Sequence, residues 1–471
     1  MRPKFNGQLE LNFRPSNLKI TTEYYQRYEK ISSVLDENPE IVNLVHKDLK
    51  KVLKRKDALG RGRKCQYASD TILRILICQI IEGESLRGIV IRIDDSSYLR
   101  EFVRIYNGPM IDYSQLCKLK NAIRPETWKK INAILADCAS EKGLLEGDRL
   151  RVDTTAYETN IRWPTDSGLL LDTYRVLSRL VSVVREIDPA AVWGKRLHVR
   201  KVRRLQSKIA RKSRGKRTES KEVKKAYNSL IQRVEGLLSF VGDLCSRLRN
   251  AIARNIYREL EAALIESLIR DMEHFRDLGL RVVDQARRRI FKGEKVPNSE
   301  KIFSIFEPHT ELIKRGKADK PIQFGHMVLL GQVESKFITH WEVFEKKPMD
   351  WQVVDLVLQR HRELFGKSPR EFSADRGFYE SSEKLKELEK EIEVVSIGSR
   401  GKRSEEEALR EASKAFKLGQ QFRAGIEGSI SFLKRALGMF RCLNKGWEHY
   451  VATVGATVFV HNLLVLARSS P

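Results

Sequence analysis

Residues 148–159 read DRLRVDTTAYET and mark the point where the character of the chain changes. Polar and apolar residues alternate along this stretch, and it is rich in β-branched side chains, as is typical of a β-strand. Asp153 lies in the middle of the predicted strand. A carboxylate in such a position is costly unless it has a partner or a function. Asp153 is therefore the first candidate functional residue.

The chain before this strand is helical in pattern. Residues 1–35 are polar with scattered aromatic side chains, and we interpret them as an N-terminal arm. Residues 36–145 carry apolar residues at helical spacing with turn signals between the segments, which predicts a helical domain for DNA binding or dimerisation. The expected helices are 69–83, 85–93, 97–103, 114–123 and 125–140.

A long helical block follows the strand. Its periodicity runs through residues 165–290, with Thr165 or Asp166 as a candidate N-cap, and predicts antiparallel helices within a basic insert over 165–298. Residues 193–225 contain 15 Lys or Arg and two Glu, a net charge of +13, which is half of the chain's excess of +26. Such a run is either a solvated loop or a surface that binds the DNA backbone.

Strand character returns after the insert. The expected strands are 301–308, a hairpin of 323–335 and 336–345, the start of 371–380, and 393–397. The expected helices are 350–366, 382–391, 405–440 with a break around Gly419, and the segment from Trp447 onward. The insert is followed by two or three strands. With two counted and the insert left out, the order is β-β-β-α-β-α-β-α, which is the connectivity of an RNase H-like fold. This predicts an α+β or α/β class, with a mixed sheet split between residues 146–164 and 299–471 and flanked by helices.

Composition narrows the function classes. The 471 residues contain 88 Lys or Arg and 62 Asp or Glu, and this excess favours a polyanionic partner, with RNA and lipid surfaces still open at this point. The six cysteines show no CxxC spacing, so a zinc ribbon has no support. The N-terminus lacks the apolar stretch of a signal peptide. Residues 450–467 are long enough to span a membrane, but His461 and Asn462 within them favour a buried helix. These features predict a cytoplasmic protein, and the resemblance described below implies a prokaryotic, nucleoid-associated one.

Two further acids stand where they could join Asp153. Asp375 follows a predicted strand, and Glu427 lies on a late helix. Three carboxylates from two adjacent strands and a helix can meet at one end of a sheet. Hard oxygen ligands of this kind suit Mg²⁺ or Mn²⁺.

These residues resemble the motifs of a known family, the DDE-type transposases of bacterial insertion sequences. The segment RVDTTAYETN surrounds Asp153, SADRGFY is similar to the family's Asp-x-Gly-Phe/Tyr pattern at Asp375, and FRAGIEGSISFLK is similar to its Arg-x₃-Glu-x₆-Lys pattern. The resemblance covers about residues 40–468. One departure is Gln420, which stands where the common pattern has a tyrosine three residues before the arginine.

The third motif has an independent geometric basis. At roughly 100° per residue, Arg423, Glu427 and Lys434 fall at roughly 0°, 40° and 20° around a helix, which is one narrow stripe. The alternative interpretation is an Arg–Glu pair on a solvated helix face. The two aspartates elsewhere in the chain favour a catalytic stripe.

The resemblance implies an enzyme that nicks DNA at the ends of a mobile element and then transfers the 3′-hydroxyl into target DNA. It implies Asp153, Asp375 and Glu427 as catalytic metal ligands, for Mg²⁺ with Mn²⁺ as a substitute and with two ions bound. Its partners would be double-stranded terminal inverted repeats and target DNA, and it would act as a homodimer or larger complex, without a membrane. The expected DNA contacts are Arg423, Lys434, Arg376, Lys195, Arg203, Arg204, Arg211 and Lys212.

Two alternatives remain. The first is an RNase H-like, structure-specific DNA nuclease, which would cut without joining. The second is a catalytically idle DNA-binding protein derived from a transposase. His326, in the predicted hairpin, is interpreted as a structural histidine rather than a base.

Overall fold

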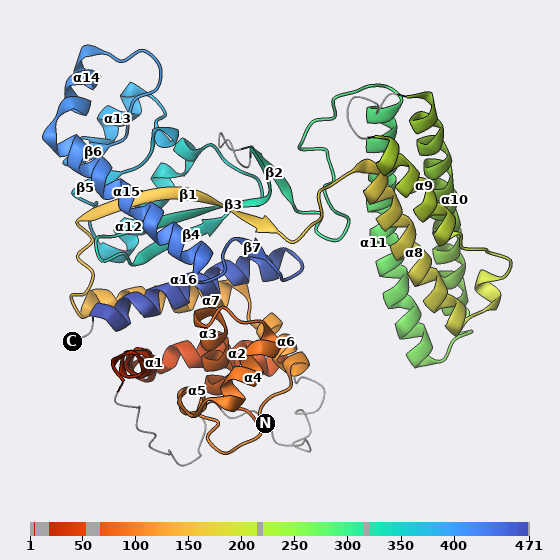
Figure 1. The fold of residues 1–471 in the computed structure, drawn as a ribbon, viewed down its shortest axis with the longest axis horizontal. Coiled ribbons are helices and arrows are strands. Elements are labelled where there is room, and N and C mark those ends of the chain that lie inside the picture. Colours follow the sequence, from red (N-terminus) through yellow and green to blue (C-terminus); the bar gives the residue numbers. More distant parts are fainter. Residues whose placement is uncertain (1–3, 5–17, 53–65, 214–219, 315–320, 470–471) are drawn as a thin grey trace. The chain divides into compact units, whose positions relative to one another are not determined.

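The computed structural model describes residue 4 and residues 18–52, 66–213, 220–314 and 321–469. The chain divides into two compact units (Figure 1). The sheet unit comprises residues 1–158 and 326–471, and the helical unit comprises residues 159–325. The protein is of the α+β class, with a mixed sheet of seven strands.

The first part of the sheet unit is a set of helices that shares one core with the last helix of the chain. These helices are α1 (Lys19–Glu37), α2 (Pro39–Lys51), α3 (Ser69–Ile81), α4 (Leu86–Asp95), α5 (Ser97–Val103), α6 (Tyr113–Ala122), α7 (Pro125–Glu141) and α16 (Trp447–Ser469). The expected helices of this region are confirmed to within a few residues. Residues 19–35 differ from the expected arm: they form most of α1, because Tyr28, Ile31 and Leu35 are buried along one face of a helix. The rest of the predicted arm, apart from Lys4 and Leu18, lies outside the described residues.

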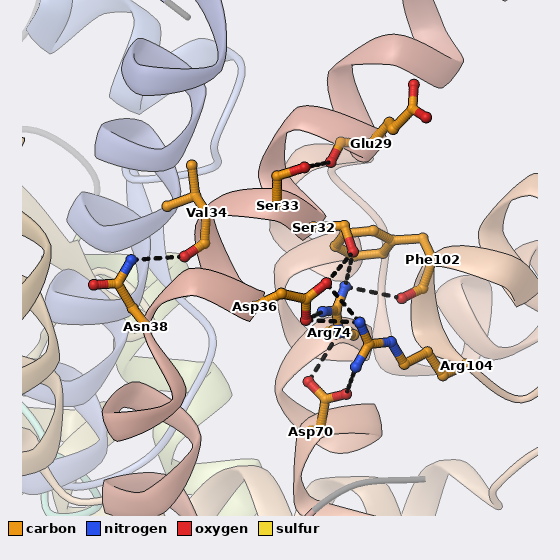
Figure 2. A network of polar contacts seen from close by, with 10 residues as sticks. All are labelled: Glu29, Ser32, Ser33, Val34, Asp36, Asn38, Asp70, Arg74, Phe102 and Arg104. Atoms are coloured by element: carbon orange, nitrogen blue, oxygen red, sulfur yellow. Dashed lines mark hydrogen bonds and ion pairs between the residues drawn. The ribbon is translucent and has the colours of Figure 1, made fainter. Parts of the chain in front are cut away.

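A polar network ties three of these helices together (Figure 2). The Arg74 guanidinium on α3 is fully buried and donates to Asp70 at 2.8 Å and to Asp36 of α1 at 2.8 Å. Arg104, which ends α5 in the left-handed conformation, donates to the same two carboxylates at 2.9 and 2.6 Å. Each buried charge thus has an opposite partner, which is the condition for burying charge without a large penalty.

Helix α16 satisfies the length and composition test for a membrane span, and the structure buries most of it within the sheet unit. Its Val454, Val458 and Phe459 belong to the core shared with the N-terminal helices. The expectation of a buried terminal helix is confirmed.

The strands of the sheet unit run in the order β4-β3-β1-β5-β6, with β7 paired to β1. Their bounds are β1 (Arg149–Thr159), β3 (Ile322–Gln332), β4 (Ile338–Val343), β5 (Glu371–Ser373), β6 (Val394–Ser396) and β7 (Arg441–Cys442). Strands β3 and β4 form the expected antiparallel hairpin, while β1, β5 and β6 run parallel. Parallel neighbours need crossover connections, which the helices between them supply.

Helices cover both faces of the sheet. They are α12 (Val354–Phe365), α13 (Ser382–Leu388), α14 (Glu405–Ala412) and α15 (Lys414–Arg435). Leu329 of β3 packs in one cluster with α12 and α13, whereas its neighbours Val328 and Leu330 pack in another with α15 and α16. Successive residues of a strand point to opposite faces, so the two clusters lie on opposite sides.

The expected helix over 405–440 is interrupted at a different place. The break falls at Ser413, whose hydroxyl accepts from the Phe416 amide and caps α15, and Gly419 lies inside α15. A Cβ atom at Gly419 would lie 2.0 Å from Ser396 Oγ. The glycine therefore serves close packing of the helix on β6 rather than a turn.

The helical unit contains α8 (Asp166–Ile187), α9 (Val199–Lys212), α10 (Lys221–Ala253) and α11 (Glu259–Ile290), as Figure 1 shows. Its residues also include the short strand β2 (Glu311–Lys314), which pairs antiparallel with the first residues of β3. Thr165 caps α8. Ion pairs join Arg249 to Glu273 and Arg287 to Glu235, so α10 and α11 are antiparallel, as expected.

The predicted strand at 301–308 is wrong. These residues form turns, because Ile302 and Ile305 are buried in the core of the helix bundle. The Ile302 amide donates to the Gln285 side chain at 2.8 Å, and the Ser304 hydroxyl accepts from two following amides. The Gln285 side chain and the Ser304 hydroxyl thus supply the hydrogen-bond acceptors that a neighbouring strand would supply to these backbone amides in a sheet.

Candidate functional site

Strand β1 presents Asp153 on the face that α15 covers. Leu150 and Val152 belong to the apolar cluster of the opposite face. Because side chains alternate along a strand, Arg151 and Asp153 point away from that cluster. Asp153 is half-buried, and its Oδ1 accepts from the Thr154 amide at 2.7 Å. Burial raises the pKa of Asp153 to about 6, and the negative charges of Asp375 and Glu427 add to this rise.

Asp375 follows β5 and lies beside Asp153. The parallel register pairs Arg149 with Glu371 and Arg151 with Ser373. Continued by two residues, the same register sets Asp153 opposite Asp375, on strands about 4.8 Å apart. Asp375 Oδ1 accepts from the Gly377 amide at 2.6 Å and caps the short 3-10 turn Arg376–Phe378. In each aspartate Oδ1 therefore accepts a hydrogen bond from the local backbone, and Oδ2 is not used by it.

Helix α15 carries Arg423 and Glu427. Arg423 Nη2 lies 3.4 Å from Glu427 Oε1, and the Glu427 side chain is 65% exposed. Arg423 lowers the pKa of Asp153 while Glu427 raises it, so both charges act on that aspartate. The buried Arg423 Nε has no hydrogen-bond partner within the described part of the chain. Lys434 lies on the same helix, about 10 Å along its axis from Glu427.

The sequence interpretation missed a fourth carboxylate. Asp350 begins the 3-10 turn Asp350–Val353 ahead of α12, and its Oδ1 accepts from Thr154 Oγ1 at 3.4 Å. Burial raises the pKa of Asp350, and the charge of Asp375 adds to this rise. The available signal was an acid at the start of a predicted helix, which reads as an ordinary helix terminus.

Gly377 lies under two of these carboxylates. A Cβ atom there would lie 2.6 Å from Asp375 Oδ1 and 2.9 Å from Asp350 Oδ2. The two oxygens therefore converge over the glycine. Arg400 holds the same loop by donating to the carbonyls of Arg376 and Gly377 at 2.8 and 3.1 Å.

Gln420, the departure from the resembled motif, has a defined structural role. Its Nε2 donates to the carbonyl of Ala374 at 3.2 Å and to that of Ser396 at 2.5 Å. These carbonyls end β5 and β6. The side chain therefore ties α15 to the strand end that immediately precedes Asp375.

The cationic residues expected to bind DNA occupy two regions. Arg376 is exposed beside Asp375 in the sheet unit. In the helical unit, α9 buries Val202 and Ile209 and exposes the four expected cations Arg203, Arg204, Arg211 and Lys212. Lys212 pairs with Glu222. Residues 214–219 of the predicted basic run lie outside the described residues.

Lys195 differs from the cations of α9. It is half-buried, its Nζ donates to the Gly236 carbonyl at 3.2 Å, and it lies 4.3 Å from the centre of the Phe240 ring. Burial lowers the pKa of Lys195. Its ammonium group thus already has contacts inside the helix bundle.

His326 is fully buried, and its ring contacts the Phe344 carbonyl at 3.0 Å. This agrees with a structural histidine. No three His, Cys, Asp or Glu side chains of the described residues stand close enough together to hold a metal ion as they are placed. The structure thus brings Asp153, Asp375 and Asp350 into one neighbourhood and leaves Glu427 within electrostatic reach, paired with Arg423.

Comparison of the chain with protein-family models, with curated proteins and with solved structures gave no match.

Proposed function

We propose that this protein is a DNA transposase of the DDE class, which nicks DNA at the ends of a mobile element and joins the freed 3′-hydroxyl to target DNA. One observation carries the proposal. The parallel register of β1 and β5 sets Asp153 beside Asp375, with Arg423 and Glu427 acting electrostatically on the same carboxylate.

The strand order supports an RNase H-like core. In the order β4-β3-β1-β5-β6, the first strand along the chain is central, the hairpin lies on one side of it, and the two later strands lie on the other. Helices pack on both faces. In open α/β sheets functional groups gather beyond the carboxyl ends of strands; Asp375 follows the end of β5, and the register sets Asp153 of the longer β1 beside it.

The carboxylates fit a divalent metal. Carboxylate oxygens are the ligands that Mg²⁺ and Mn²⁺ prefer, and Asp153 and Asp375 each have an oxygen not used by local backbone. Two bound ions would activate the attacking oxygen and stabilise the leaving oxygen at phosphorus. Because like charges and burial disfavour the ionised form of Asp153, a bound cation would relieve an unfavourable interaction already present in the protein.

The chain's own cations would hold the DNA. Arg423 pairs with Glu427 through Nη2, and the exposed part of its guanidinium would donate to a phosphate oxygen. The exposed cations of α9 offer a second surface for the phosphate backbone, where binding falls steeply with salt. Salt-insensitive DNA binding would contradict this assignment.

The test uses the purified full chain, Mg²⁺, and oligonucleotides that carry inverted repeats from the DNA flanking the gene. We expect a nicked product and a strand-transfer product from the wild type, and neither from Asp153→Asn, Asp375→Asn or Glu427→Gln. Glu363→Gln is the control, since Glu363 pairs with Arg360 on the exposed face of α12. Nicking without joining would favour a nuclease. Absence of both reactions in the wild type would overturn the proposal.

A further inference from the structure

Arg151 is an unusual buried residue two positions before Asp153 on β1. It is only 5% exposed, and its side chain lies on the face that α15 covers. None of the carboxylates in the described residues forms an ion pair with it. Its hydrogen-bond acceptors are the side-chain oxygen of Gln332, at 2.9 and 2.6 Å, and the backbone carbonyl of Phe422, at 2.8 Å.

The contacts of Arg151 fix one point of α15. The Phe422 ring lies 4.6 Å from the guanidinium carbon, and the Phe422 carbonyl accepts from Nη1. A Cβ atom at Gly425 would lie 2.1 Å from the same Nη1, so the guanidinium occupies space that any other residue at position 425 would fill. The helix thus rests directly on the arginine for one full turn.

Gln332 extends the attachment to the next turn. It lies at an irregularity in the pairing of β3 with β4, where a strand re-aims its side chains. Its Nε2 donates to Ser429 Oγ at 2.9 Å and to the Lys336 carbonyl at 2.7 Å. Helix α15 is therefore attached to the sheet at Phe422 and at Ser429, the two positions that flank Arg423 and Glu427.

This network does not serve stability alone. A buried charge with only neutral partners is expensive, and apolar replacements of buried charged groups are often neutral or stabilising. A guanidinium does offer donors in a rigid fork, which fixes the relative position of the groups that it joins. Burial lowers the pKa of Arg151 to about 10, in keeping with a poorly compensated charge.

We propose that Arg151 is a positioning residue that fixes Glu427 and Arg423 on α15 relative to Asp153 on β1. The proposal rests on the proposed function. Residues that orient the ligands of a metal site typically change metal affinity or activity by about 10- to 100-fold when replaced. Displacement of a reacting group by about 1 Å can reduce the rate by about 100-fold.

The test compares Arg151→Met and Arg151→Lys with the matched control Arg149→Met. Arg149 lies on the same strand and stacks on the same Phe422 ring at 4.0 Å, but its donors go to Glu371 on β5 rather than to α15. Each full-length variant is measured for thermal unfolding, for Mn²⁺ binding by electron paramagnetic resonance without DNA, and for kcat and KM of nicking.

For Arg151→Met we expect kcat to fall about 100-fold and Mn²⁺ affinity about 10-fold, with KM for DNA and the unfolding midpoint close to wild type. Arg151→Lys keeps the positive charge but loses the planar set of donors. Its kcat and Mn²⁺ affinity should lie between those of Arg151→Met and wild type. Arg149→Met should keep wild-type Mn²⁺ affinity and kcat.

Wild-type Mn²⁺ affinity and kcat in a folded Arg151→Met variant would overturn the inference, as would equal losses in Arg149→Met. If Arg151→Met fails to fold, Arg151→Lys decides the matter by the same criteria. A wild-type protein that neither binds Mn²⁺ nor nicks DNA would instead refute the proposed function, and this inference with it.

Discussion

Replacing Asp153 with Asn removes a negative charge from an unfavourable place and leaves the size of the side chain unchanged. Burial, together with Asp375 and Glu427, raises the pKa of Asp153 from 3.8 to about 6. The folded protein therefore binds this proton more tightly than the unfolded chain does. The stability contributed by this group is fully present below about pH 4 and is lost as the pH rises through about 6.

The pKa shift sets the size of the effect. A rise of about two pK units corresponds to about 3 kcal/mol at about 1.36 kcal/mol per unit. Relative to wild type, Asp153→Asn should raise the free energy of unfolding by about 3 kcal/mol at pH 7.5, about 1.5 kcal/mol at pH 5 and about 0.5 kcal/mol at pH 4. The asparagine oxygen can still accept from the Thr154 amide, so no local hydrogen bond is lost. For a unit of this size the change at pH 7.5 is roughly 5 °C in Tm.

The assay is calorimetric or denaturant unfolding of metal-free protein between pH 4 and 8. Asp148→Asn is the control, since Asp148 heads the same strand and Lys367 lowers the pKa of its exposed carboxyl. That variant should lose stability at neutral pH, which is the opposite sign. Mg²⁺ should stabilise the wild type and leave Asp153→Asn unchanged. An Asp153→Asn variant with no gain between pH 4 and 7.5 would refute the reasoning about the site's charge.

Three further outcomes follow from other contacts. Gly377→Ala should fold normally yet nick DNA about 100-fold more slowly, because the new methyl group displaces the Asp375 carboxylate; unchanged nicking by a folded variant would contradict this. Changing Arg204 and Arg211 to Gln should reduce the slope of log binding constant against log salt by roughly two, measured by fluorescence anisotropy, whereas an unchanged slope would remove α9 from the DNA surface. Arg74→Met should destabilise the protein by about 3–5 kcal/mol, since it leaves Asp70 buried with one partner fewer; a loss below about 1 kcal/mol in urea unfolding would show that this network contributes little.

The sequence predicts those elements of the fold in which buried and exposed positions recur at a regular spacing. The apolar spacing of α7 and α12 is set by one buried face each, so the period in the sequence reveals the helix. Asp153 and Asp375 could also be predicted locally, as acids within or just after predicted strands. Their mutual approach follows from parallel pairing of those strands.

A contact that one side chain makes with a residue distant in the chain leaves no periodic pattern in the sequence, so it could not be predicted. Asp350 reads as a helix start, and only the packing of the preceding turn beside Thr154 and Gly377 brings it to the other acids. Residues 301–308 have the composition of a strand, but the Gln285 side chain satisfies the Ile302 amide and the bundle buries the apolar residues. In both cases the tertiary partner decides the structure, and the local sequence does not contain it.

Arg151 and Asp153 of β1 give a final argument about the site. Arg151 and Asp153 share one face of the strand, and pairing them would reduce the burial penalty of both charges. The structure instead directs the guanidinium to Gln332 and the Phe422 carbonyl, while Asp153 faces Asp375. An aspartate neutralised by Arg151 could not serve as a strong ligand for a cation, because its charge would already be compensated. The hydrogen bond from Arg151 to α15 positions the helix and leaves the Asp153 carboxylate available for a cation. Arg151 thus meets two requirements of the proposed site.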